Sequence, residues 1–181
     1  MVEPTSLGAI RQDTWFVLLD PAWQPANPQT QAPPEAIVGG WMLDEDGKAG
    51  PFQPNPDYVP GDESTPTDPT DAVLRLIAAG QDVRDQLVPT VRDAVLEIAV
   101  DDHDQPIVSP APDGVPCVLV VTASAHKARV DAQNWWPVVG AMLPEIVPDG
   151  VDILLNPGGP ASFRLSTEAL RAGAEASGKD G

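Results

Sequence analysis

Cysteine, histidine and basic residues are scarce in this chain of 181 residues. The one cysteine, Cys117, excludes an intramolecular disulfide and a metal site built from cysteine alone. The two histidines, His103 and His126, give little support to histidine catalysis, which needs an orienting partner and a nucleophile in reach. Lys and Arg total 10 against 27 Asp and Glu, a formal net charge of −17. This charge repels phosphate, which excludes nucleic acid as a partner and disfavours an anionic membrane.

Long hydrophobic runs are also missing. Apolar runs such as residues 117–121 are far shorter than the roughly 20 residues of a membrane helix. The N-terminal segment MVEPTSLGAIRQDTWF has no basic region followed by the apolar stretch of a signal peptide. We therefore expect a cytoplasmic protein with no membrane insertion.

The hydrophobic content of 42% is sufficient for a core, and the length fits one domain. Proline is in excess, with 22 residues, which favours many turns and few long helices. We expect a flexible N-terminus at residues 1–12, a single domain over residues 13–174, and a disordered tail at residues 175–181. Within the domain, the Pro-rich acidic stretch at residues 50–68 is expected to be an irregular, mobile insertion.

Apolar runs bounded by turn residues predict the strands of the fold. They cover residues 14–19, 36–43, 94–100, 106–108, 116–122, 135–139, 151–155 and 161–165. Helices are predicted at residues 69–79, at residues 81–87 where Pro89 would end the helix, from residue 122 or 124 to 132, and at residues 140–147 and 167–174. This order predicts an α+β fold with one mixed sheet flanked by short helices.

The helix at residues 69–79 has the clearest signals. Asp68 can cap it, and Pro69 suits its first position. An apolar stripe follows, and Gly80 can adopt the left-handed conformation that ends a helix.

The second half of the chain has a recognisable pattern. Residues 116–171 (PCVLVVTASAHKARVDAQNWWPVVGAMLPEIVPDGVDILLNPGGPASFRLSTEALR) resemble the N-terminal domain of the SseB (enhanced serine sensitivity) family. Residues 13–171, with the segments WFVLLDP, GGWMLDEDGK and LLNPGGPASFRLS, are similar to short actinobacterial proteins described as type VII secretion system-associated. The resemblance implies an SseB-like α+β domain with no established catalytic residues and a role tied to secretion.

Two acidic clusters resemble metal sites. Asp101, Asp102 and Asp104 surround His103, but neighbouring side chains on a turn splay outward, so a solvated hairpin turn is the better interpretation. The segment at residues 44–47 resembles a calcium loop, yet its fifth position is Lys48 and its twelfth is Asn55. We expect no metal and no cofactor.

Residues 156–160 (NPGGP) follow a strand, as a phosphate-binding loop does, but no Lys or Arg lies beside them and the prolines remove amide donors. A structural turn is the better interpretation. Ser124 and Ser166 are interpreted as helix caps, His126 as a surface residue, and Cys117 as a buried small hydrophobe.

Tryptophan provides the candidate binding residues. Trp15 and Trp41 lie in apolar stretches that are predicted as strands, so their side chains are expected in the core. Trp23 lies in a polar, Pro-rich loop, and one of Trp135 and Trp136 should be exposed because neighbouring strand residues face opposite sides. Exposed tryptophan is frequent at interface hot spots, so these three are the candidate partner-binding residues.

We expect a non-enzymatic, acidic interaction protein associated with a type VII secretion system, with a secretion component or a basic secreted protein as its protein partner. An immunity-like protein that neutralises a basic secreted toxin is the alternative, because acidic inhibitors bind basic enzymes through opposite charge. A hydrolase or a nucleotide-binding enzyme has less support, which consists only of the abundant carboxylates and the Gly158–Gly159 turn.

Overall fold

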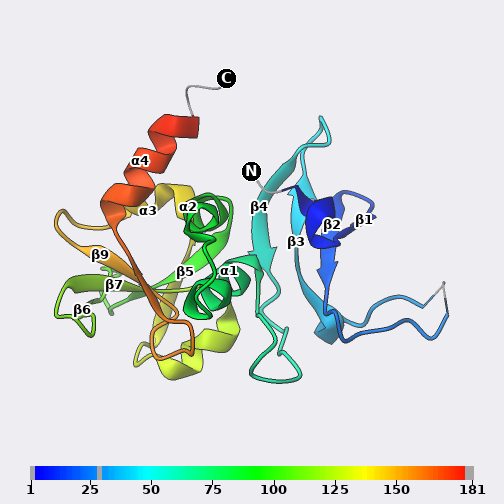
Figure 1. Cartoon of the computed structure of the whole chain (residues 1–181), viewed down its shortest axis with the longest axis horizontal. Coiled ribbons are helices and arrows are strands. Elements are labelled where there is room, and N and C mark those ends of the chain that lie inside the picture. The colour runs from blue at the N-terminus through cyan, green and yellow to red at the C-terminus, as the bar shows by residue number, and fades with distance from the viewer. Residues whose placement is uncertain (1–2, 28–29, 178–181) are drawn as a thin grey trace.

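The computed structural model describes residues 3–27 and 30–177, which form two lobes with a pair of helices between them (Figure 1). One lobe holds a four-stranded antiparallel sheet and the other a six-stranded mixed sheet. The predicted α+β class is therefore confirmed, whereas the prediction of one mixed sheet is wrong.

The N-terminal lobe is an antiparallel meander. Its strands, in spatial and chain order, are β1 (Ile10–Gln12), β2 (Trp15–Leu19), β3 (Ile37–Leu43) and β4 (Ala49–Pro54). Two 3-10 helices accompany them, η1 (Pro4–Leu7) and η2 (Pro34–Ala36). Thus η1 and β1 occupy the stretch that the sequence predicts as a flexible N-terminus, while residues 1–2 lie outside the described residues.

Strand β4 is the reason for the second sheet. The sequence predicts residues 50–68 as irregular because of their prolines, but Pro51 and Pro54 lie on a strand that pairs with β3 and meets the second half of the chain at a single bridge, Phe52–Ala94. Proline is tolerated at both positions: the nitrogen of Pro54 lies on the side away from β3, and Pro51 lies where the register with β3 shifts between Trp41 and Leu43. Apart from that bridge, the first strands pair with one another and not with the strands of the second half.

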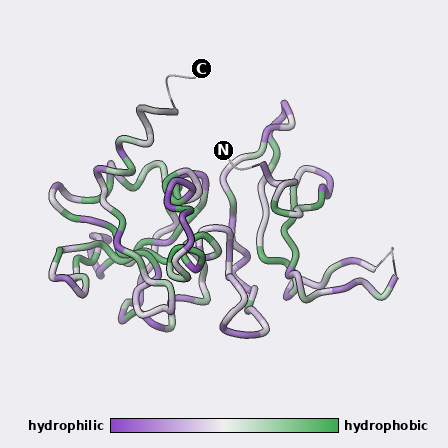
Figure 2. Tube along the Cα trace, viewed as in Figure 1, coloured by the Kyte–Doolittle hydropathy of each residue, from purple (hydrophilic) through white to green (hydrophobic). Residues whose placement is uncertain are grey.

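The C-terminal lobe is a mixed sheet of order β10-β9-β7-β5-β8, with β6 also paired to β7. Strands β7 and β9 are parallel, and the other pairs are antiparallel. The bounds are β5 (Val95–Val100), β6 (Val108–Pro110), β7 (Pro116–Val121), β8 (Asn134–Val139), β9 (Asp152–Leu155) and β10 (Phe163–Leu165). In Figure 2 hydrophobic segments coincide with the inner strands, as their apolar runs predict.

The helices are short. They are α1 (Pro69–Ala78), α2 (Arg84–Arg92), η3 (Ser124–Arg129), η4 (Gly140–Met142), α3 (Leu143–Ile146) and α4 (Thr167–Ser177). The prediction for α1 is confirmed in detail: Asp68 caps it by accepting from the backbone N–H of Asp71, and Gly80 beyond its end has a φ of 83°.

Helix α2 differs from its prediction because it continues through Pro89. Proline removes one backbone donor from the helix, but Pro89 and Asp85, whose carbonyl would have accepted that bond, are both exposed. Leu87 and Val91, on the opposite face, are fully buried. Burial of these two side chains outweighs the lost hydrogen bond.

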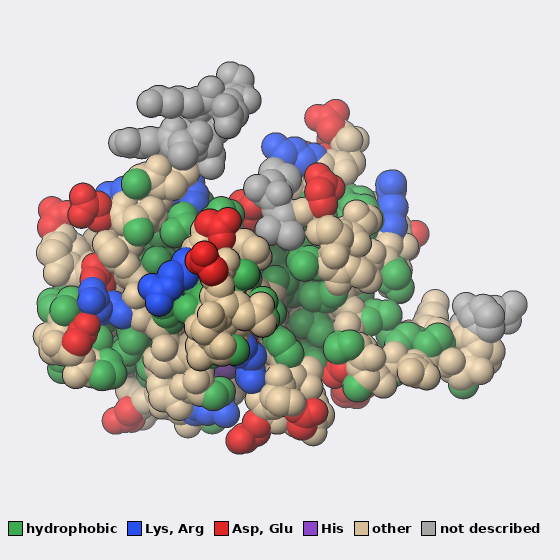
Figure 3. Space-filling model, viewed as in Figure 1, with side chains coloured by type: hydrophobic (Ala, Val, Ile, Leu, Met, Phe, Trp, Pro, Cys, Tyr) green, Lys and Arg blue, Asp and Glu red, His purple; other side chains and the backbone are tan. Residues whose placement is uncertain are grey.

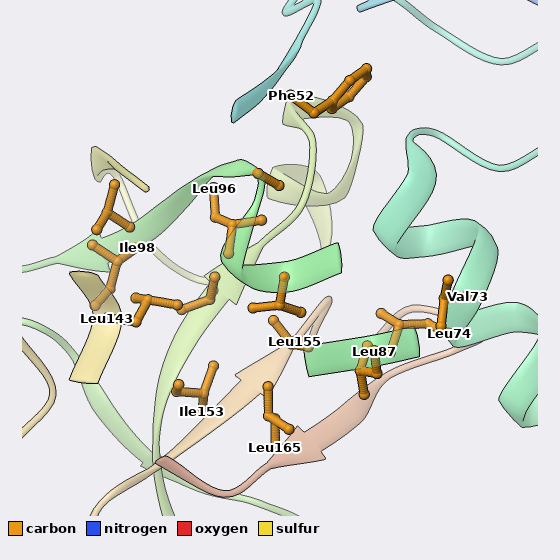
Figure 4. Packing of buried hydrophobic residues seen from close by; sticks show 14 of the residues in the cluster. Phe52, Val73, Leu74, Leu87, Leu96, Ile98, Leu143, Ile153, Leu155 and Leu165 are labelled. Atoms are coloured by element: carbon orange, nitrogen blue, oxygen red, sulfur yellow. The ribbon is translucent and has the colours of Figure 1, made fainter. Parts of the chain in front are cut away.

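One hydrophobic core spans both lobes (Figure 4). Phe52 of β4 connects them: its N–H donates to the Asp93 carbonyl over 2.7 Å, and it forms a parallel bridge with Ala94. Its ring lies 4.7 Å from that of Trp41, edge on. Tyr58 is also buried, and its hydroxyl donates to Asp20. The segment at residues 50–68 is therefore packed onto the body of the protein at two aromatic residues.

Candidate functional site

Strands β7 and β9 are parallel neighbours, so their carboxyl ends meet at one edge of the sheet. Thr122 follows β7 and Asn156 follows β9, and both are buried. The Asn156 side-chain carbonyl accepts from the N–H of Thr122 over 2.9 Å. Asn156 has a positive φ of 47°, which asparagine tolerates better than most residues. Proteins of the α/β class commonly bind ligands at such an edge, so its side chains form a candidate site.

The start of α1 brings two carboxylates to this edge. Asp68 Oδ2 accepts from the hydroxyls of Thr67 and Thr122, over 2.7 and 2.6 Å. Asp68 is buried, and desolvation together with the nearby charge of Asp71 raises its pKa to about 6. The second carboxylate, Asp71, forms an ion pair with Arg75 over 2.7 Å. Each carboxylate is thus hydrogen-bonded, as a buried charge must be.

His126 also lies here, so its prediction as a surface residue is wrong. It is 1% exposed because η3 turns the ring inward from the end of β7. Its Nε2 lies 2.9 Å from the Thr67 hydroxyl. Burial lowers the pKa of His126, although the charge of Asp71 opposes this shift. Burial therefore favours the neutral form of the ring.

We call these residues the buried polar cluster: Thr67, Asp68, Asp71, Thr122, His126 and Asn156. A catalytic triad needs a hydroxyl and a carboxylate on opposite nitrogens of one imidazole. Here Asp71 Oδ1 approaches the same Nε2 that contacts Thr67, over 3.8 Å. Every member is at most 3% exposed, so a substrate has no access to them. The cluster attaches α1 to the sheet.

The acidic clusters of the sequence are turns. Asp101 accepts from the N–H groups of His103 and Gln105, and Asp44 does so from those of Asp46 and Lys48. Within residues 3–27 and 30–177, no group of three or more His, Cys, Asp or Glu is placed to hold a metal.

The other predicted residues have mixed outcomes. Gly158 has a φ of 70°, and its Cβ would approach the carbonyl of Arg129, as expected of a structural turn. Cys117 is fully buried, which confirms its prediction, and burial raises the pKa of its thiol. Ser124 does not cap η3; its hydroxyl donates to Glu97 instead.

The tryptophans are only partly as predicted. Trp41 is in the core, but Trp15 is half-buried because it pairs with the exposed Met42 on the outer face of its sheet. Of the candidate binding residues, Trp136 is 43% exposed, and Trp135 and Trp23 are half-buried. The three do not form one patch, because Trp135 and Trp136 are neighbours on edge strand β8 whereas Trp23 lies in the β2–β3 loop.

A feature that the sequence analysis missed is a groove between the lobes. Two adjoining hollows, of about 80 and 340 Å³, share Leu7, Pro69, Val73 and Gln86 as lining residues, and we call them together the inter-lobe groove. Figure 3 shows hydrophobic side chains gathered between the lobes. No sequence signal could reveal the groove, because its walls come from η1, β3, β4, α1 and α2, which only the fold brings together.

The smaller hollow lies between aromatic and helical side chains. Trp41 and Phe52 line it from the sheet, and Thr70 and Val73 from α1. Thr70 is 1% exposed, and among the described residues its hydroxyl has no hydrogen-bond partner. An unpaired buried hydroxyl costs about 1–3 kcal/mol, so a polar atom entering this hollow would recover stability.

Comparison of the chain with protein-family models, with curated proteins and with solved structures found no match. None of the helices in the described part of the chain is long and apolar enough to cross a membrane.

Proposed function

We propose that this chain is a non-enzymatic interaction protein whose partner is a basic protein. The observation that carries the proposal is the contrast between its two candidate sites. The groups suited to acid–base or nucleophilic chemistry are enclosed and bonded to one another in the buried polar cluster. The inter-lobe groove, in contrast, is open and largely apolar, which suits recognition.

The charge supports a basic partner. With a net charge of −17, the surface attracts cationic proteins over long range and repels acidic ones. The resemblance of residues 13–171 to type VII secretion system-associated proteins favours an accessory role in that system. The same acidity favours an immunity-like protein that binds a basic toxin as the second candidate.

Deletion of the gene in its own host tests the proposal. The accessory role predicts reduced export of type VII substrates, with their cellular amounts unchanged, and restoration by a plasmid copy. The immunity role predicts that the deletion is tolerated only when the neighbouring toxin gene is deleted as well. Normal export together with normal viability would contradict both, and turnover of a small-molecule substrate by the purified chain would contradict the non-enzymatic assignment.

A further inference from the structure

We propose that the inter-lobe groove is the docking site for a partner segment that carries an apolar anchor side chain flanked by Lys or Arg. This inference rests on the proposed interaction function and names the surface and the chemistry of the partner. It follows from the shape of the groove, from the unpaired hydroxyl inside it and from the charges around it.

The narrow end of the groove fits an aliphatic side chain. Its volume of about 80 Å³ is half that of an engineered cavity of about 150 Å³ that binds benzene. Trp41, Phe52 and Val73 supply apolar contact, and the Thr70 hydroxyl supplies one hydrogen-bonding group. Binding sites commonly combine apolar walls with a few placed polar groups.

The wider end offers exposed apolar surface on both walls. Leu7 of η1 is 40% exposed and Leu76 of α1 is 37% exposed. Both line the hollow of about 340 Å³. They would contact the apolar residues that follow the anchor.

The charges around the groove select a cationic segment. A third hollow adjoins the narrow end through Ala49, Gly50 and Asp93. Outside the buried polar cluster, the charged side chains that line the three hollows are Asp44, Asp93 and Lys48. Residues 1–66, with Asp44 and Lys48 included, carry ten Asp and Glu but only two Lys and Arg. A second copy of this chain would bring the same net charge of −17 and be repelled, so the occupant is a basic segment of another protein.

The test is selection of peptides from a phage-displayed library of random 12-residue sequences on the full chain, followed by affinity measurement with the synthesised peptides. We expect peptides with an apolar residue flanked by Lys or Arg, whose affinity falls with added salt. Leu76→Glu and Leu7→Glu, on opposite walls, should each weaken binding at least tenfold. Thr70→Val, which keeps the shape and removes the hydroxyl, should weaken it roughly threefold to tenfold.

Val108→Glu is the matched control, since Val108 is 46% exposed and lies on β6, outside the groove. It should leave the affinity unchanged, and melting curves should show that all variants are folded. Acidic or uncharged peptides, failure to recover a peptide of micromolar affinity, or equal effects of Leu76→Glu and Val108→Glu would overturn the inference. So would self-association through Leu76. Loss of binding in Trp136→Ala alone would overturn the groove and leave the proposed function standing.

Discussion

The hydroxyl of Thr122 donates a hydrogen bond of 2.6 Å to the carboxylate of Asp68, and both side chains are buried. Thr122 follows the central strand β7, and Asp68 caps helix α1. The helix that forms one wall of the inter-lobe groove is therefore fixed to the C-terminal sheet by a charged residue. The group that fixes this wall has a pKa raised to about 6 by its burial and by the charge of Asp71.

Substitution of Asp68 by Asn should flatten the pH dependence of stability. Asp68 has a pKa raised from 3.8 to about 6, so the fold favours its protonated form. Its contribution to stability is fully present below pH 3.8 and is lost as the pH rises through about 6, a change of about 3 kcal/mol. Asn caps helices as well as Asp does and stays neutral. The free energies of unfolding of wild type and Asp68→Asn are measured in urea from pH 4 to 7.5. As the pH rises, the stability of Asp68→Asn relative to wild type should increase.

The control is Asp131→Asn, because Asp131 is exposed. Its stability curve should run parallel to that of wild type. If the curve of Asp68→Asn were also parallel, Asp68 would have an ordinary pKa in the folded protein.

His126 should be a neutral imidazole with its proton on Nε2. The Thr67 hydroxyl donates its proton to Asp68, so it can only accept from the ring nitrogen 2.9 Å away. Nitrogen-15 chemical shifts at pH 7 should show a protonated Nε2 and an unprotonated Nδ1, and Thr67→Val should weaken this preference. The lowered pKa of His126 gives stability above pH 6.5 that is lost as the pH falls. A protonated Nδ1 would contradict the hydrogen-bond assignment.

The elements that sequence reasoning predicted correctly have local causes. The cap at Asp68 and the stop at Gly80 lie next to the helix they delimit, and apolar runs such as residues 116–122 are buried wherever they are placed. The number of sheets, in contrast, depends on which strands pair with one another along their edges. The prolines of β4 suggested a loop because local rules do not reveal an outer edge, as at Pro54, or a register shift, as at Pro51.

The sites were harder to predict for the same reason. His126 is predicted on the surface because it lies at the start of a predicted helix, yet its partners Thr67 and Asp71 are more than 50 residues away in the sequence. Trp15 and Phe16 occupy the same apolar run, and only the pairing of the strands decides that Phe16 rather than Trp15 faces Trp41. Long-range contacts of this kind leave no mark on a single sequence.

Truncation of the Phe52 side chain in Phe52→Ala should lower the free energy of unfolding by about 3–5 kcal/mol. Its ring is 3% exposed and contacts Trp41, and its backbone joins the two lobes. Val59→Ala is the matched control within the same Pro-rich stretch, because Val59 is 73% exposed and should cost less than about 0.5 kcal/mol. Urea denaturation measures both. Equal stability of the two variants would mean that residues 50–68 are the irregular, mobile insertion that the sequence predicts.

Replacement of Gly140 by Ala should destabilise the protein although it adds only one methyl group. A Cβ at Gly140 would collide with the backbone carbonyl of Val91 in α2, and the N–H of Gly140 donates to the Ala94 carbonyl over 2.8 Å. Backbone cannot move aside as a flexible side chain can, so the overpacking should cost about 1–3 kcal/mol.

Gly61→Ala is the control, since nothing lies within 4 Å of a Cβ there. It should leave the free energy of unfolding unchanged or raise it by up to about 1 kcal/mol, because alanine restricts the unfolded chain. Denaturation of both variants under one set of conditions decides the matter: if Gly140→Ala were as stable as Gly61→Ala, α2 and η4 would not be packed as closely as this fold requires.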